Sequence, residues 1–312
     1  AGHIDLIVVR GHNRRRMRYL AERTGVFVRA LRVYQWTKNL LVVAALIFAR
    51  QLGEPEQVLR SLGAFIAFCM AASATYLFND LIDMEKDRAH PEKRLRPLPS
   101  GELRPETAAI LSGLLLLGAI ALAWAVRPMF LLALLFYLAL TISYSLALKH
   151  YLIIDVLAIA LGFVTRALAG AIALDVKFSN WLVVCTLFLA MFLGLNKRRH
   201  EITLLEEDAL NHRRVLYQYS VHYLDQLILI MAGGALITYT IYTCSPEVVE
   251  RLGTDKLYLT IPFVVYGLFR YLYLVHRHAE GGDPGSTLLK DAPLAVNVAL
   301  WAGACAAILY LL

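Results

Sequence analysis

The sequence predicts an all-α, polytopic membrane protein with nine transmembrane helices around a lipid-accessible cavity. Three observations support this fold class. Of the 312 residues, 59% are hydrophobic, and the mean hydropathy is +0.57. Apolar runs of membrane-spanning length recur along the whole chain. The polar residues between them collect in the loops of one side, so we expect a polar active site at the cytoplasmic face.

The nine expected spans follow one another with mostly short connections. A helix needs about 20 apolar residues to cross the hydrocarbon core, and the first and sixth runs reach this length only with a few flanking residues. The runs cover approximately residues 36–50, 61–80, 105–126, 128–148, 152–174, 180–196, 224–243, 256–275 and 291–311.

The distribution of lysine and arginine orients these spans. With the N-terminus on the cytoplasmic side, 23 of the 31 Lys and Arg residues fall in cytoplasmic segments, six fall in outer loops and two lie inside spans. Cytoplasmic loops carry the excess of basic residues in membrane proteins. We therefore expect a multi-pass protein of the cell (inner or plasma) membrane whose N-terminus and active site are cytoplasmic.

Two regions are expected along the chain, a basic cytoplasmic arm over residues 1–30 and a nine-helix domain over residues 31–312. The arm lacks the short apolar segment of a cleavable signal peptide. Its four arginines between positions 14 and 18 are typical of contacts with anionic lipid, and nucleic acid is not expected as a partner. The four cysteines have no CxxC spacing, so neither a disulfide framework nor a zinc site is predicted.

Three aspartates follow the second apolar run. Asp80, Asp83 and Asp87 are spaced i, i+3 and i+7, which on a helix confines their carboxylates to a sector of roughly 60°. Like charges held so close repel one another, which indicates a cation between them. Oxygen ligands favour Mg²⁺, which commonly binds one or two carboxylates together with substrate phosphates. A solvated loop of mixed charge is the alternative interpretation.

Basic residues follow the aspartates directly, and their side chains can donate to phosphate oxygens. We predict that Lys93, Arg94 and Arg96 bind phosphate beside the metal ion, and that Asn79 belongs to the same site. The basic residues of this segment are Lys86, Arg88, Lys93, Arg94 and Arg96.

A second candidate site lies at the end of the sixth apolar run, in the segment NKRRHE. Lys197, Arg198, Arg199 and His200 put four potentially cationic side chains in a row, which suits phosphate binding. Lys197 and Glu201 are i, i+4 neighbours if the helix continues. Alternatively, the basic run only marks the cytoplasmic end of a span, and His200 is a solvated interfacial histidine.

Weaker candidates lie at the ends of other spans or inside them. Ionisable residues inside a span are costly and usually functional, which singles out Asp155 and Arg166 of the fifth span. Eleven residues apart, these two are too distant for direct contact on one helix. Asp291 opens the ninth span, either as a ligand or as a helix cap. The other candidate binding residues are Lys38, Asn39, Tyr144 and Lys149.

These motifs resemble the UbiA-type superfamily of intramembrane prenyltransferases. The first acidic motif of that superfamily reads NDxxDxxxD followed by RPLPSG, here residues 79–87 and 96–101. The nine-span layout agrees over nearly the whole chain after about residue 30. The resemblance implies an enzyme that binds a Mg²⁺-diphosphate donor in a helical cavity open to lipid.

One departure from that superfamily changes the expected substrate. Most members carry a second acidic motif after the sixth span, where this sequence reads NKRRHE. Together with QWTKN, YSLALKHYLIIDV and GFVTRALAGA, this variant is similar to the branch of polyprenyl-phosphate (decaprenyl-phosphate) phosphoribosyltransferases. In that branch the donor is phosphoribosyl diphosphate (PRPP) and the acceptor is a long-chain polyprenyl phosphate. The product, polyprenyl-phosphoryl-5-phosphoribose, is a precursor of cell-wall arabinan in arabinogalactan.

The resemblance also implies roles for the candidate residues. Asp80, Asp83 and Asp87 would hold the donor diphosphate through Mg²⁺ and stabilise it as the leaving group. The basic clusters at 93–96 and 197–199 would hold the 5-phosphate and the lipid phosphate, and the sequence leaves open which takes which. The lipid phosphate is already an anion, so transfer depends on positioning and electrostatic stabilisation rather than on a strong base.

Two other functions stay open at this point. A prenyltransferase with an aromatic or other small acceptor predicts a second acidic motif, which Glu201, Glu206, Glu207 and Asp208 imitate only in part. A lipid or solute transporter predicts an internal repeat with midplane polar residues in both halves, whereas the acidic motif occurs once. The acceptor chain length, the number of Mg²⁺ ions and the oligomeric state stay open as well, a homo-oligomer included.

Overall fold

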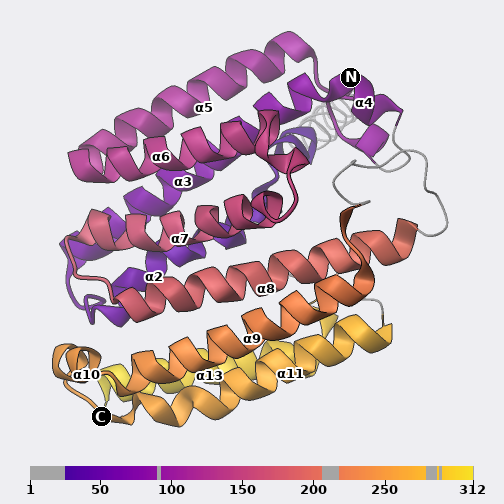
Figure 1. The fold of residues 1–312 in the computed structure, drawn as a ribbon. Coiled ribbons are helices and arrows are strands. Elements are labelled where there is room, and N and C mark those ends of the chain that lie inside the picture. The colour runs from indigo at the N-terminus through magenta and orange to yellow at the C-terminus, as the bar shows by residue number, and fades with distance from the viewer. Residues whose placement is uncertain (1–24, 90–92, 206–217, 279–286, 288–289, 312) are drawn as a thin grey trace, which may run out of the picture. The chain divides into compact units, whose positions relative to one another are not determined.

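The computed structural model describes residues 25–89, 93–205, 218–278, 287 and 290–311. Every regular element in these residues is a helix (Figure 1), which confirms the predicted all-α class. Most of the expected N-terminal arm, residues 1–24, lies outside the described residues, as do Glu206, Glu207 and Asp208.

Eight helices in the described part of the chain are long and apolar enough to cross a membrane. They correspond to the second to ninth expected runs, so the chain is a multi-pass membrane protein. These helices are α3 (Pro55–Ile82), α5 (Pro105–Val126), α6 (Pro128–Leu146), α7 (Ile154–Leu174), α8 (Asn180–Leu205), α9 (Val221–Cys244), α11 (Ile261–His278, preceded by η5, Lys256–Thr260) and α13 (Ala292–Tyr310).

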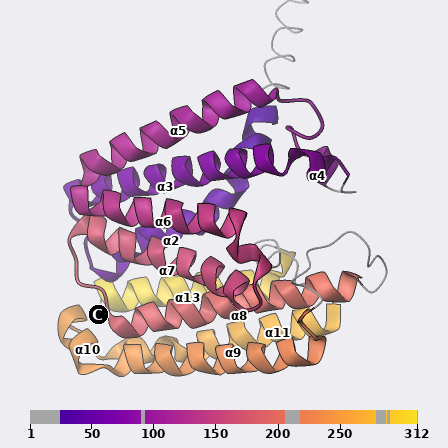
Figure 2. The ribbon, with the colours of Figure 1, turned by 45° about the horizontal axis from the view of Figure 1, so that its top comes forward.

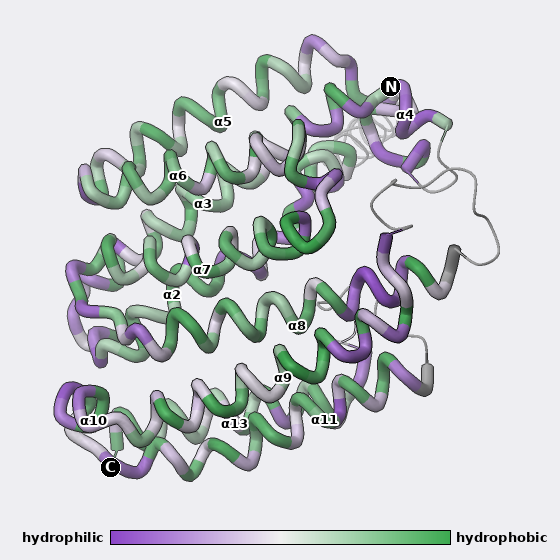
Figure 3. The backbone as a smooth tube through the Cα atoms, in the orientation of Figure 1, coloured by the Kyte–Doolittle hydropathy of each residue, from purple (hydrophilic) through white to green (hydrophobic). Residues whose placement is uncertain are grey.

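The first expected run forms a shorter apolar element than the other eight. It consists of the 3-10 helix η1 (Val33–Asn39) and of α2 (Leu40–Phe48), which together fall below spanning length. The tube in Figure 3 is hydrophobic along most of each long helix and more hydrophilic near the helix ends. The remaining short elements are α4 (Met84–Arg88), η2 (Lys93–Leu95), η3 (Leu148–His150) and α10 (Pro246–Leu252).

Local sequence signals explain where several helices begin. Helices α3, α5, α6 and α10 start at a proline, which the first turn tolerates because its N–H groups have no partner within the helix. Asp291 caps α13, since its Oδ1 accepts a hydrogen bond of 2.9 Å from Leu294 N. The same carboxylate accepts 2.8 Å from Arg270 Nη2. The interpretation of Asp291 as a helix cap is therefore confirmed.

The described residues form two compact units, one within Ala1–Thr37 and Ala67–Ala121 and the other within Lys38–Ile66 and Leu122–Leu312. In the first unit, the C-terminal part of α3 packs against α5, where Ser112 Oγ donates to Ala74 O at 2.9 Å. The aspartate motif lies in this unit, at the end of α3.

The second unit is organised around α7, which is buried along most of its length. It packs against α2, α6 and α8, and α8 packs in turn against α9. Figures 1 and 2 both show α8 and α9 side by side. Alanine and glycine line much of the buried surface of α7, as is usual where membrane helices approach closely.

The closest approach of α7 to α2 leads to a stability prediction. A Cβ atom on Gly170 of α7 would collide with the backbone carbonyl group of Val42 on α2. We expect Gly170→Ala to destabilise the protein by about 1–3 kcal/mol, because backbone cannot move aside as a side chain can. Thermal unfolding of the purified protein in detergent measures the effect.

Gly113 of α5 provides the matched control, because a Cβ there meets nothing within 4 Å. Gly113→Ala should leave the unfolding temperature unchanged or raise it, since alanine is favoured over glycine in a helix interior. If the two variants unfold at the same temperature, the close contact between α2 and α7 is wrong.

Candidate active site

The aspartate motif spans the junction between α3 and α4. Backbone hydrogen bonds from Asp83 N to Asn79 O (2.9 Å) and from Asp87 N to Asp83 O (2.8 Å) continue the helical pattern across the junction. Asp80 and Asp87 are each only 4% exposed, whereas Asp83 and Asn79 are half-buried. A buried carboxylate is stable only when it is paired or bound to a cation.

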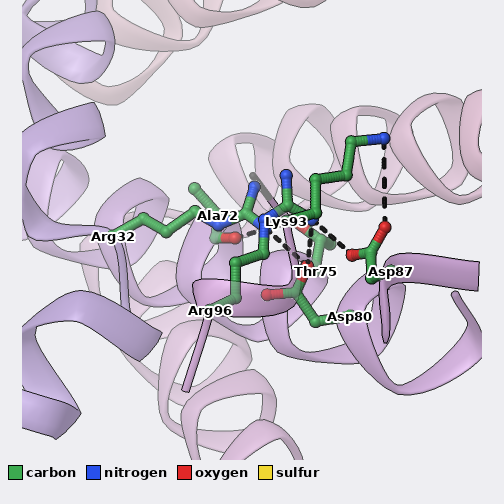
Figure 4. Close-up of polar contacts among 7 residues, drawn as sticks. All are labelled: Arg32, Ala72, Thr75, Asp80, Asp87, Lys93 and Arg96. Atoms are coloured by element: carbon green, nitrogen blue, oxygen red, sulfur yellow. Dashed lines mark hydrogen bonds and ion pairs between the residues drawn. The ribbon is translucent and has the colours of Figure 1, made fainter. Parts of the chain in front are cut away.

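Basic side chains of the first unit surround the two buried carboxylates (Figure 4). Arg96 Nη1 donates to Asp87 Oδ2 at 2.6 Å and to Asp80 Oδ1 at 3.2 Å, so one guanidinium group bridges both. Lys93 Nζ lies 3.9 Å from Asp87 Oδ1. Arg32 Nη2 donates to Asp80 Oδ1 at 2.5 Å. The structure thus brings together Asp80, Asp87, Lys93 and Arg96, as well as Arg32, which the sequence analysis missed.

Other basic residues of this segment lie differently. Arg88 pairs with the exposed Glu85 at 2.8 Å, and the side chain of Arg94 is exposed. Neither makes an ion pair with Asp80 or Asp87 among the described residues. Arg94 therefore stays a predicted phosphate ligand without a contact in the acidic cluster.

The donor set of this cluster fits a Mg²⁺ ion that is shared with a substrate. Within the described residues, no three His, Cys, Asp or Glu side chains lie close enough together to hold a metal ion alone. Asp80 and Asp87, however, are buried and converge on one nitrogen of Arg96. Mg²⁺ typically takes one or two carboxylates and completes its shell with phosphate oxygens and water, which suits this pair.

The second predicted cluster lies on α8, which continues through NKRRHE to Leu205. Arg198 is 2% exposed. Its Nε donates to Asp155 Oδ2 at 2.7 Å, its Nη1 to Glu201 Oε2 at 2.5 Å and its Nη2 to Tyr144 OH at 3.3 Å. Three other residues singled out from the sequence therefore surround the guanidinium group of Arg198 in the second unit.

Tyr219 completes this network. Its hydroxyl donates to Asp155 Oδ1 at 2.9 Å and accepts 2.8 Å from Ile153 N. Burial, together with the neighbouring carboxylate, raises the pKa of Tyr219, which keeps the hydroxyl protonated as a donor. Ile153 has a φ of 67°, a strained backbone position for a β-branched residue that persists only when neighbouring contacts hold it. Tyr219 provides such a contact.

The other residues of the α8 cluster have different surroundings. Arg199 Nε donates to Asp225 Oδ1 at 2.6 Å. Lys197 is half-buried and makes no ion pair among the described residues. Nδ1 of His200 is buried without a hydrogen-bond partner in the described part of the chain. Among the described residues, Lys197, Nδ1 of His200 and the Nη atoms of Arg199 thus have hydrogen-bonding capacity left for a ligand.

A third set of polar contacts surrounds Arg166 inside the second unit. Its Nε donates to Asn39 Oδ1 at 2.8 Å, its Nη1 to Gly162 O at 2.9 Å and its Nη2 to Tyr137 OH at 2.9 Å. Arg166 and Asp155 therefore bind different partners, as their separation along the helix indicated. Lys38 in η1 and Lys149 in η3 are both half-buried.

Four partners of these sites were missed from the sequence, namely Arg32, Tyr137, Tyr219 and Asp225. Tyr137 and Asp225 did carry a signal, because each interrupts or borders an apolar run with a polar group. Arg32 lies in the basic flank of the first span, where the positive-inside rule by itself accounts for an arginine. For Tyr219 there was no signal, since it lies 64 residues from Asp155.

Comparison with known proteins connects this geometry to a family. A model of the UbiA prenyltransferase family matches residues 39–290. The chain belongs to the UbiA prenyltransferase family. The predicted resemblance is confirmed, and with it the prediction of a membrane-embedded transferase.

Two relatives of this UbiA-family chain are similar over most of their length. It is 30% identical over 292 residues to decaprenyl-phosphate phosphoribosyltransferase of Mycolicibacterium smegmatis, covering 91% of this chain and 92% of the relative. It is 31% identical over 282 residues to the protein of the same name from Corynebacterium glutamicum, covering 88% and 83%.

A solved structure shares the fold of this UbiA-family chain. A UbiA homolog from Archaeoglobus fulgidus, bound to GPP and Mg²⁺, has a TM-score of 0.69 and 18% sequence identity. The likeness covers 91% of this chain and 99% of that one. The UbiA-like helical fold that the sequence predicted is therefore confirmed.

Proposed function

We propose that this chain transfers 5-phosphoribose from PRPP to a polyprenyl phosphate such as decaprenyl phosphate. The reaction releases diphosphate and gives polyprenyl-phosphoryl-5-phosphoribose, a precursor for cell-wall arabinan. The observation that carries this proposal is the basic stretch of α8, Lys197 to His200, at the place where the resemblance to prenyltransferases predicts acids. The names of the mycobacterial and corynebacterial relatives support the same donor and acceptor.

The acidic motif is proposed to bind the diphosphate of the donor. Asp80, Asp83 and Asp87 would hold Mg²⁺, which neutralises the charge that develops on the departing diphosphate. The Archaeoglobus homolog, solved with GPP and Mg²⁺, supports a divalent metal ion in this fold. Arg96 and Lys93, which already lie against the carboxylates, can donate to diphosphate oxygens, and Asn79 and Arg94 complete the proposed set.

The second unit is proposed to bind the other phosphate groups. Lys197, His200 and the Nη atoms of Arg199 retain hydrogen-bonding capacity, and Arg198 orders the cluster because it pairs with Asp155 and Glu201. Phosphate binding by a row of cations is favourable because each adds a charge-assisted hydrogen bond. The proposed binding residues of this unit are Lys38, Asn39, Tyr144, Lys149, Arg166, Lys197, Arg198, Arg199, His200 and Glu201.

The chemical step needs little acid–base help from the protein. The bond between ribose C1 and the diphosphate oxygen breaks, and its electron pair leaves with the diphosphate. An oxygen of the lipid phosphate, already an anion, forms the new bond to C1. The contribution of the side chains is to position the two substrates and to stabilise the leaving group.

The test is transfer of label from ribose-labelled PRPP into an organic-extractable lipid, with purified protein, Mg²⁺ and a polyprenyl phosphate. We expect incorporation that EDTA abolishes and that excess Mg²⁺ restores. Activity on a prenyl diphosphate with a small aromatic acceptor, without incorporation from PRPP, would assign the chain to prenyl transfer. The absence of either activity in a folded preparation would favour a transporter.

We further propose that the chain lies in the cell membrane with its N-terminus and acidic motif on the cytoplasmic side. Cys244, at the end of α9, is exposed, whereas Cys69, Cys185 and Cys305 are buried. In the proposed orientation Cys244 lies at the outer surface. We expect a membrane-impermeant maleimide to label intact spheroplasts at this residue, and Cys244→Ser to abolish labelling. Labelling only after the membranes are permeabilised would place Cys244 on the cytoplasmic side and contradict the proposed orientation.

A further inference from the structure

We infer that Arg32 is an internal counter-ion of the acidic motif, which competes with the metal ion for Asp80 and passes to the diphosphate when metal and diphosphate bind together. The inference rests on the proposed function only in that the motif binds a divalent cation and a diphosphate. It gives Arg32, outside the aspartate motif and its basic flank, a part in binding the donor.

The contact between Arg32 and Asp80 lies where a metal ligand would act. Arg32 Nη2 lies 2.5 Å from Asp80 Oδ1, the same oxygen that accepts a hydrogen bond from Arg96 at 3.2 Å. The side chain of Arg32 is 17% exposed and that of Asp80 is 5% exposed. A divalent cation bound to Asp80 must therefore share or displace a guanidinium group, because two cations on one carboxylate oxygen repel each other.

The charges of the first unit support an exchange of partners. The carboxylates of Asp80 and Asp87 are matched by the guanidinium groups of Arg32 and Arg96, and Lys93 adds a further positive charge 3.9 Å from Asp87, so the cluster has no negative charge in excess. A metal ion alone adds two positive charges to this cluster, and the positive charge of Arg32 repels it. A metal ion with diphosphate also brings phosphate oxygens, and a released guanidinium group binds these at least as well as a carboxylate.

The segment around Arg32 is hydrogen-bonded to Ser73 of α3 on both sides of Arg32. Ser73 Oγ donates to Leu31 O at 2.9 Å and accepts 3.0 Å from Trp36 Nε1. Arg32 itself has a φ of 51°, a strained position that these flanking contacts hold in place. The segment is thus anchored on both sides of Arg32.

One face of α3 gives Arg32 a second contact besides the one with Asp80. Ser73, Tyr76 and Asp80 are spaced i, i+3 and i+7 and therefore lie on the same side of the helix. The guanidinium carbon of Arg32 lies 4.8 Å from the centroid of the Tyr76 ring, within the range of a cation–π contact. The ring can keep the guanidinium group beside the site once the carboxylate of Asp80 binds a metal ion instead of Arg32.

The experiment compares two ligands on the purified, full-length protein in detergent. The first is Mn²⁺ alone, a spectroscopic substitute for Mg²⁺, followed by electron paramagnetic resonance. The second is inorganic pyrophosphate at saturating Mn²⁺, followed by calorimetry. We expect Arg32→Gln to bind Mn²⁺ about tenfold more tightly than wild type and pyrophosphate about tenfold more weakly. A residue with only a structural role cannot move the two affinities in opposite directions.

Arg29→Gln is the matched control. Arg29 lies three residues before Arg32 and pairs with the exposed Glu102 instead of with the acidic motif. This variant should bind both ligands like the wild type. Arg32→Lys keeps a positive charge without the guanidinium fork. It should bind Mn²⁺ about threefold more tightly and pyrophosphate about threefold more weakly than wild type. This variant provides the test if Arg32→Gln does not fold.

Unchanged or weaker Mn²⁺ binding by both Arg32 variants overturns the inference, as does unchanged pyrophosphate binding. Neither measurement uses PRPP or a lipid. If the two affinities shift in opposite directions but no ribose phosphate is transferred, the role of Arg32 as counter-ion stands and the proposed function is wrong. If ribose phosphate is transferred but the opposed shifts are absent, the proposed function stands and the role of Arg32 is wrong.

Discussion

Asp80→Asn is expected to lower the rate of phosphoribosyl transfer by about a thousandfold, the largest effect among the substitutions considered. The side chain keeps its volume but loses its charge and one of two acceptor oxygens. Asp80 is 4% exposed and accepts hydrogen bonds from Arg32 and Arg96. Without the carboxylate, the motif loses a metal ligand and Arg32 loses its ion-pair partner, whereas Arg96 keeps Asp87.

The rate of label transfer from PRPP into lipid measures this loss, with the unfolding temperature as a check on folding. Asp175→Asn is the matched control, because Asp175 pairs with Arg127 at 2.6 Å on an exposed surface of the second unit. The hydrogen bond from Arg127 lowers the pKa of Asp175, so this substitution also removes a negative charge. Asparagine tolerates the left-handed φ of 56° at this position.

We expect Asp175→Asn to retain activity within about twofold of wild type, as is usual for a surface pair. A folded Asp80→Asn protein with nearly full activity would falsify the assignment of the acidic motif to the metal ion and diphosphate. Equal losses in Asp80→Asn and Asp175→Asn would instead indicate a general effect of carboxylate removal on the protein.

Arg198→Met is expected to produce the largest loss of stability, about 3–5 kcal/mol. The side chains of Arg198 and Asp155 are 3% and 0% exposed, so removal of the cation leaves a buried carboxylate without its counter-charge. Glu201 and Tyr144 lose a donor at the same time. Methionine fills most of the space, so the loss reflects charge and hydrogen bonding more than a cavity.

Thermal unfolding in detergent measures the effect, and the neighbouring Arg199→Met provides the control. Arg199 pairs with Asp225, whose side chain is 32% exposed, and this change should cost at most about 1 kcal/mol. The double substitution Arg198→Met with Asp155→Leu removes both charges and should recover much of the lost stability. If Arg198→Met and Arg199→Met unfold alike, Arg198 is not the centre of the cluster.

Much of the fold could be predicted from the sequence because its determinants are local. Hydropathy over about 20 residues defines a membrane helix whatever it packs against, and eight of the nine expected runs match helices of spanning length in the described residues. The prediction of a ninth span from the first run has no matching helix of spanning length, because η1 and α2 together are shorter than a span. A continuing helix through NKRRHE was also foreseeable, since no proline or glycine interrupts it.

The candidate site was predicted less completely. The spacing of the aspartates indicated a cation between their carboxylates, and in the structure the side chain of Arg96 bridges Asp80 and Asp87. From the sequence, the row of basic residues on α8 indicated one phosphate site of four potentially cationic side chains, with a solvated interfacial histidine as the alternative for His200. The structure separates them, because Arg198 is buried among its partners whereas Lys197 is half-buried.

The sequence by itself determined the helices, the acidic motif and the family, since each depends on residues close together in the chain. Tertiary structure decided which charged and polar side chains meet. Arg32 pairs with Asp80 across 48 residues, Arg198 with Asp155 across 43, and Arg166 with Asn39 across 127. A buried charge must find a partner because its desolvation is costly, but any of several cations satisfies that requirement. Only the packing of the helices selects one of them.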